Sequence, residues 1–92
     1  MSYDKIYNII KYLILKIENY IEECNKKNEL DELSELIYIL ISNSLNTIKD
    51  NDINKYNEIV NYIEKMSNLK VKTTPGITNK CIFKHMDLLD EL

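Results

Sequence analysis

Arginine, alanine, glutamine and tryptophan are absent from this chain, and glycine and proline occur once each. Without arginine, the chain lacks the side chain best suited to bidentate recognition of phosphate or guanine. With a single glycine, it cannot form a glycine-rich loop that cradles a phosphate group. Isoleucine, lysine and asparagine are abundant instead, a bias that is typical of an AT-rich genome rather than of a particular function.

Histidine and cysteine are also scarce, which limits the metals that the chain can bind. The single histidine, His85, has no glutamate three residues before it, so the Glu-x-x-His motif of a di-iron bundle is missing. Zinc would need four ligands, and His85, Cys24 and Cys81 are too few and too far apart. We therefore expect no metal and no cofactor. Because no export signal is evident, we expect two free thiols rather than a disulfide.

One cysteine and the histidine have a spacing that could support catalysis. Cys81 and His85 are four residues apart, which would bring them to one face of a helix. The pattern places Cys81 before the start of the last helix, however, and no third group that would orient the pair is evident. We interpret the pair as a small buried thiol near a surface histidine. We expect that the chain is not an enzyme.

Residues 50–54 begin like a calcium-binding loop, with oxygen-bearing side chains at alternate positions. The rest of the loop pattern fails, because Lys55 stands where glycine is needed and Asn61 stands where a bidentate glutamate is needed. Capping of the following helix by one of the residues 50–52 explains the same side chains without a metal.

The longest apolar run is Leu36–Ile41, six residues in the middle of the chain. A bilayer span needs about 20 apolar residues, so this run is too short to cross a membrane. At the start of the chain, lysines interrupt the apolar residues at helical spacing, and we therefore predict no signal peptide and no membrane partner. We expect a cytoplasmic location, in a bacterium or, for a viral or phage protein, in the host cell.

Apolar residues recur at steps of three and four through most of the chain, which predicts amphipathic helices. The predicted helices cover Tyr3–Cys24, about 29–49, with Asn28 as N-cap, and about 52–69. Short connections predict that neighbouring helices pack antiparallel. We predict one domain, residues 1–92, with an all-α fold: an antiparallel bundle of three long helices plus a short C-terminal helix.

Residues 70–82 differ from the rest, because they are rich in β-branched residues and contain the only proline and glycine. Pro75-Gly76 fits the centre of a type II turn, in which glycine adopts a positive φ. The segment is either a loop or a small β-hairpin. The short last helix is predicted from Phe83 to the end, with Met86, Leu89 and Phe83 packed on the bundle.

The charge pattern suggests one kind of partner. The net charge is −3, but residues 70–86 contain no acidic residue. Their lysines form a candidate contact for an anionic partner: Lys70, Lys72, Lys80 and Lys84. Three helices, a hairpin and a last helix also follow the chain order of a winged helix. One hypothesis is therefore a winged-helix-like DNA-binding module that uses this basic segment.

A second feature is a surplus of apolar residues on the polar faces of the predicted helices. These candidate partner-binding residues are Tyr12, Leu15, Tyr38, Ile39 and Tyr62. A cluster of tyrosines and aliphatic residues on a surface marks a partner or self-association site. We favour a small acidic helical protein that binds another protein, as an inhibitor, immunity factor, anti-defence protein or regulatory subunit. A self-associating structural protein, such as a homodimer, is a further alternative.

Overall fold

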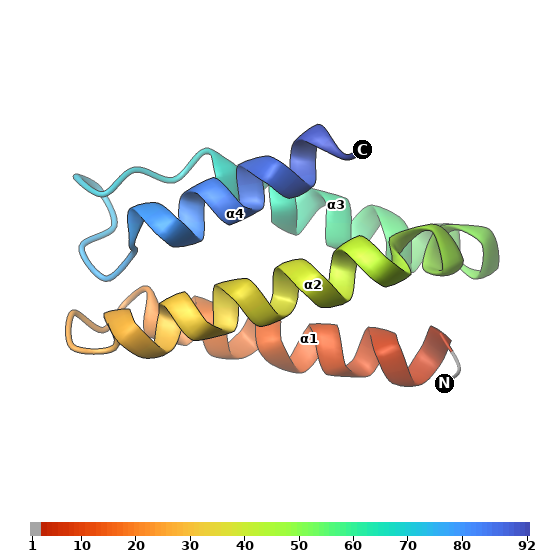
Figure 1. Ribbon diagram of the computed structural model, residues 1–92, viewed down its shortest axis with the longest axis horizontal. Helices are drawn as coiled ribbons and strands as arrows, with labels where there is room; N and C mark the ends of the chain where they lie inside the picture. Colours follow the sequence, from red (N-terminus) through yellow and green to blue (C-terminus); the bar gives the residue numbers. More distant parts are fainter. Residues whose placement is uncertain (1–2) are drawn as a thin grey trace.

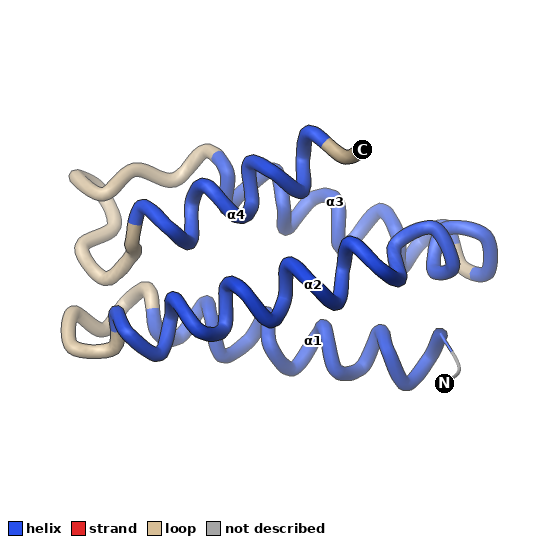
Figure 2. The backbone as a smooth tube through the Cα atoms, in the orientation of Figure 1, coloured by secondary structure: helices blue, strands red, loops and turns tan. Residues whose placement is uncertain are grey.

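The computed structural model describes residues 3–92, which form helices and loops but no strand (Figures 1 and 2). The helices are α1 (Tyr3–Tyr20), α2 (Lys27–Asn51), α3 (Ile53–Ser67) and α4 (Asn79–Asp90). The predicted all-α class is confirmed. α2 packs against each of the other three helices, and α4 also packs against α3. In Figure 1, α1 runs beneath α2 in the opposite direction, and α4 lies above α2. None of the described helices is long and apolar enough to cross a membrane.

The ends of the helices differ from the predicted ends. α1 stops at Tyr20 instead of Cys24, because the chain turns there and the N–H of Glu23 bonds to the carbonyl of Tyr20 at 3.0 Å. α2 begins before Asn28: Lys26 is its N-cap and makes no side-chain capping bond, so the predicted Asn28 cap is wrong. α2 also runs two residues beyond its predicted end.

The N-cap of α3 agrees with the capping interpretation of residues 50–52. The Asp52 carboxylate accepts hydrogen bonds from the backbone N–H groups of Asn54 (3.1 Å) and Lys55 (3.2 Å). These bonds satisfy two of the N–H groups that the first turn of a helix leaves without partners.

The last helix begins four residues earlier than predicted, at Asn79. Thr78 is its N-cap and accepts a hydrogen bond from the N–H of Cys81 at 3.1 Å. The Thr78 hydroxyl in turn donates to Asp31 on α2 at 2.6 Å, which ties the start of α4 to α2. Cys81 therefore lies inside the helix, on the same face as His85, and its predicted position before the helix is wrong.

The core is a continuous cluster of mostly isoleucine side chains from all four helices. Its largest fully buried members, with Ile77 from the loop before α4, are Ile10, Ile17, Leu30, Ile37, Ile41, Ile48, Ile59, Ile63, Met66, Ile77 and Leu88. Two serines of α2, Ser34 and Ser44, are also buried, and each donates to the carbonyl four residues before it. Phe83 and Met86 of α4 are exposed, so the prediction that they pack on the bundle is wrong.

Residues 68–78 form a loop that closes over the end of α1. The N–H of Ile77 bonds to the carbonyl of Thr74 at 3.1 Å, and the Ile77 side chain enters the core. No glycine has a positive φ, so the predicted type II turn at Pro75-Gly76 is wrong. Glycine is needed for another reason. A Cβ atom on Gly76 would lie 2.2 Å from the carbonyl oxygen of Ile21.

Replacing Gly76 by alanine should therefore lower the free energy of unfolding by about 1–3 kcal/mol, the usual cost of overpacking that displaces backbone. The added methyl group would force the loop away from the end of α1. Urea unfolding of the variant tests this expectation. Lys72→Ala, in the exposed part of the same loop, is the control and should change stability by less than about 0.5 kcal/mol. Equal stability of the Gly76 variant and the parent protein would contradict the close contact.

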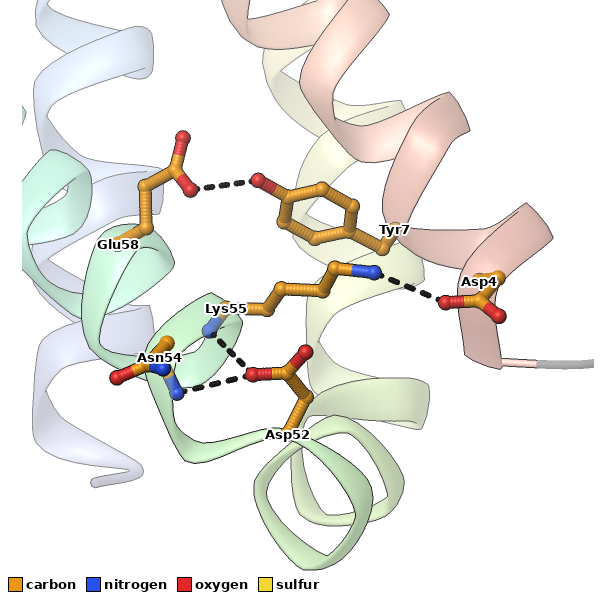
Figure 3. A network of polar contacts seen from close by, with 6 residues as sticks. All are labelled: Asp4, Tyr7, Asp52, Asn54, Lys55 and Glu58. Atoms are coloured by element: carbon orange, nitrogen blue, oxygen red, sulfur yellow. Dashed lines mark hydrogen bonds and ion pairs between the residues drawn. The ribbon is translucent and has the colours of Figure 1, made fainter.

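α1 meets α3 through polar side chains. The ion pairs between them are Asp4–Lys55 at 2.9 Å, Lys11–Glu58, and Glu18–Lys65 at 2.7 Å. Figure 3 shows Lys55 extending from α3 to Asp4, and Tyr7 of α1 donating its hydroxyl to Glu58. Exposed ion pairs contribute little to stability. α1 is therefore held mainly by its apolar packing on α2.

Candidate functional site

The antiparallel pair α1 and α2 carries exposed apolar residues on its outer side. Ile9 and Tyr12 of α1 are exposed, Tyr12 to 57%. Leu36 and Ile39 of α2 are also exposed, to 46% and 55%. Counted from the turn between the helices, Tyr12 and Leu36 are at nearly the same height, because Tyr12 lies eight residues before Tyr20 and Leu36 nine residues after Lys27. Ile9 and Ile39 each lie three residues further from the turn. None of the four is among the residues of α1 that pair with α3 or the residues of α2 that contact α4.

These residues belong to two outer seams with helical spacing. The seam of α1 is Lys5, Ile9, Tyr12, Lys16 and Asn19, and the seam of α2 is Glu29, Glu32, Leu36, Ile39 and Asn43. Steps of three and four place each set on one side of its helix. We call the surface formed by these ten residues the α1–α2 face. It is apolar in the middle, basic along α1 and acidic at the start of α2.

The structure places the predicted partner-binding residues in different environments. Tyr12 and Ile39 lie on the α1–α2 face, and Leu15 is 55% exposed on the side of α1 nearer to α3. Tyr38 is half-buried, because α4 covers it: the Lys84 ammonium lies 4.7 Å from the centre of its ring. Tyr62 is buried at 7% exposure, so its predicted position on the surface is wrong. α4 covers the side of α3 on which Tyr62 lies.

Sequence reasoning missed two members of the face, Ile9 and Leu36. Ile9 adjoins the apolar spacing of α1, and Leu36 begins the longest apolar run, so both patterns predict a buried side chain. A second pattern in the sequence could have identified them. Ile9 and Leu36 also lie on the outer seams, where steps of three and four connect them to lysines on α1 and to glutamates on α2.

The predicted basic contact is partly used within the protein. Lys70 and Lys72 are exposed in the loop before α4. Lys80 forms an ion pair with Glu35 of α2 at 2.9 Å, and this partner raises the pKa of Lys80. Lys84 lies over the ring of Tyr38. Two of the four lysines thus join α4 to α2, and residues 68–78 form no hairpin that would serve as a wing.

A cluster of polar side chains lies inside the bundle, around His85. His85 is fully buried, which corrects the prediction of a surface histidine. Its Nδ1 lies 2.7 Å from the Cys81 carbonyl oxygen, which can only accept, so Nδ1 carries the proton and donates. Nε2 of the neutral ring then accepts from the Tyr62 hydroxyl at 2.8 Å. The Tyr62 and His85 rings meet edge to face, with centroids 5.2 Å apart.

Burial keeps this cluster uncharged at neutral pH. It raises the pKa of the Cys81 thiol to about 11, although a hydrogen bond with Ser34 acts in the opposite direction. Burial also lowers the pKa of His85 and raises the pKa of Tyr62 well above its usual value. A nucleophilic cysteine needs a lowered pKa, so that its thiolate is populated. The Cys81 Sγ lies 3.8 Å from His85 Nδ1, but in this environment it stays a thiol.

Other arrangements of reactive groups are few in the described part of the chain. Cys24 and Cys81 are both free, the first exposed and the second buried. Within residues 3–92, no three His, Cys, Asp or Glu side chains lie close enough together to hold a metal ion. A shallow pocket of about 510 Å³ lies between the end of α1, α3 and the loop before α4. Of its three charged side chains, Glu18 and Lys65 pair with each other, and Glu22 is exposed.

Comparisons with protein-family models, with curated proteins and with solved structures gave no significant match. The fold and its surfaces define a small all-α bundle with an exposed apolar face and a buried, neutral polar cluster.

Proposed function

We propose that this protein acts by binding another protein through the α1–α2 face, in a non-catalytic role. The observation that supports the proposal is the group of large apolar side chains, Ile9, Tyr12, Leu36 and Ile39, exposed on one surface. Partner surfaces commonly combine an apolar, tyrosine-containing centre with a charged rim. An inhibitor or a regulatory subunit needs no more than such a surface.

The chemistry of the buried cluster also favours a non-catalytic role. Cys81 and His85 form the one pair with the spacing of a nucleophile and its base. Both are buried, and the raised pKa of the thiol leaves it protonated at neutral pH. The cluster instead connects α3 to α4 through the Tyr62–His85 hydrogen bond. DNA binding has weaker support, because Lys80 and Lys84 already have partners on α2.

Site-specific photocrosslinking tests the proposal. A photoreactive amino acid is placed at position 12, in the centre of the α1–α2 face, and the protein is irradiated in an extract of the cells that produce it. We expect a discrete adduct whose mass exceeds that of the chain by the mass of the partner. The same amino acid at position 57, exposed on α3, is the control and should give no such adduct.

Leu36→Glu should abolish the adduct formed at position 12, because a buried, unpaired carboxylate strongly disfavours association. The α-helical circular dichroism of this variant should match that of the parent protein, since Leu36 is exposed. Equal labelling from positions 12 and 57, or no labelling from either, would refute the proposed role of the face.

A further inference from the structure

The charges around the apolar centre of the α1–α2 face are arranged in a self-complementary way. Lys5 and Lys16 lie on the α1 seam, and Glu29 and Glu32 lie on the α2 seam. Among the ion pairs between residues 3–92, none includes any of these four side chains. One half of the face is therefore basic and the other half acidic. The Lys16 ammonium lies 5.1 Å from the centre of the Tyr12 ring on the same helix and is in no ion pair, so it can still pair with a carboxylate of a partner.

A two-fold axis parallel to the helices would place α1 of one copy against α2 of a second copy. The two helices would be antiparallel, as α1 and α2 are within one chain, and their residues would meet at the same heights. Residues equally far from the turn would then face each other across the interface. The facing pairs are Lys5 with Asn43, Ile9 with Ile39, Tyr12 with Leu36, Lys16 with Glu32, and Asn19 with Glu29.

Each pair in this register matches chemically. The apolar residues meet apolar residues in the middle, Lys16 meets Glu32, and the remaining pairs are polar. The symmetry doubles every pair, because an isologous interface uses the same patch on both copies. The steps of three and four on both seams are also the spacing at which antiparallel helices interlock in bundles.

We propose that the partner on the α1–α2 face is a second copy of this chain, bound about a two-fold axis parallel to α1 and α2. The proposal rests on the protein-binding function given above and identifies its partner. In the dimer, Ile9, Tyr12, Leu36 and Ile39 of the two copies form one apolar interface. The two Lys16–Glu32 pairs at its edge fix which helices face each other.

Sedimentation of the purified protein over a range of concentrations tests the dimer. The parent protein should approach about twice its chain mass of 10.9 kDa as its concentration rises. Tyr12→Glu should remain a monomer. Phe83→Glu, at a residue of α4 that is 60% exposed and outside the α1–α2 face, is the matched control and should dimerise like the parent.

A charge exchange tests the register. Lys16→Glu and Glu32→Lys should each raise the dissociation constant at least about tenfold, because each variant alone brings like charges together twice. An equimolar mixture of the two variants should recover the dimer, since both facing pairs are then oppositely charged. Pairing within one chain would give no recovery on mixing.

The failures of this inference and of the proposed function are distinguishable. A parent protein that sediments as a monomer at concentrations up to about 1 mM overturns the dimer, because its dissociation constant would then exceed about 1 mM. The function proposed above then stands if position 12 still crosslinks to a different protein. A dimer that persists in Tyr12→Glu overturns this interface. If the mixture of Lys16→Glu and Glu32→Lys does not dimerise more tightly than either variant alone, the register is wrong.

Discussion

Replacing Ile41 by alanine should lower the free energy of unfolding by roughly 2–5 kcal/mol, the range for truncating a fully buried aliphatic side chain. Ile41 is 0% exposed in the middle of α2, the helix that packs against all three others. Its loss would leave a cavity lined by several helices, which cannot all move inward to fill it. A small domain has a net stability of about 5–15 kcal/mol, so this loss would be a large fraction of the total.

Leu40→Ala is the matched control, one residue away in the same apolar run. Leu40 is half-buried against the core, and its truncation should cost only about 1–2 kcal/mol, because a half-buried side chain removes less apolar area from water on folding. Urea unfolding at one pH, followed by circular dichroism, measures both variants. Equal losses at the two positions would mean that the run is buried uniformly, contrary to the structure.

The run Leu36–Ile41 illustrates how far the sequence predicts this fold. Capping signals and apolar spacing correctly placed the run inside a long helix of an all-α protein. They did not determine which of its six residues are covered. Ile37 and Ile41 face the core, α4 half-covers Tyr38, and Leu36 and Ile39 remain exposed. That outcome depends on where α4 lies, which no local pattern specifies.

The buried polar groups were harder to predict, for a related reason. Ser34 reads as a polar surface residue, yet it is fully buried where α4 approaches α2, and its hydroxyl is satisfied by the Leu30 carbonyl at 2.8 Å. A small side chain at this position leaves room for Cys81. Tyr62 of α3 and His85 of α4 likewise form a hydrogen bond with each other. Such pairings depend on long-range contacts, so hydrophobic periodicity alone excludes these residues from the core.

The extent of the exposed apolar surface was partly predictable. The sequence predicts that Tyr12 and Ile39 are exposed, because they interrupt otherwise polar helix faces, and both are. The exposure of Ile9 and Leu36 was not predicted, because each adjoins the apolar stripe of its helix and reads as part of it. Whether a residue at the edge of the apolar stripe is buried depends on how closely α1 and α2 approach each other. That distance is set by the side chains of both helices.

Lowering the pH from 7.5 to 5.5 should destabilise the protein because His85 is buried. Burial lowers the pKa of His85 below its usual value of 6.5, so the unfolded state binds the proton more readily than the folded state. The free energy of unfolding therefore falls as the pH drops below about 6.5 and is fully retained above it. For one proton, the slope cannot exceed about 1.4 kcal/mol per pH unit.

The geometry gives the molecular reason for this acid sensitivity. In the neutral ring, Nε2 accepts the hydrogen bond from the Tyr62 hydroxyl. A proton on Nε2 would turn this acceptor into a donor, and the hydroxyl would have to rotate its own hydrogen away. The groups around the ring offer little compensation: Cys81 remains a thiol, Ser34 is neutral, and the Glu18 carboxylate near Tyr62 is paired with Lys65.

Urea unfolding at pH 7.5 and at pH 5.5 measures the effect, which is isolated because His85 is the single histidine of the chain. Glu35, whose pKa is lowered by Lys80, titrates only below its usual 4.5 and does not contribute at pH 5.5. In His85→Gln, which cannot take up the proton, the difference between the two pH values should vanish, even if the variant is less stable at both. The NMR titration of the His85 ring in the parent protein should give a pKa below 6.5. A pKa at or above that value, or equal stability of the parent protein at both pH values, would show that the buried imidazole is not the acid-sensitive group.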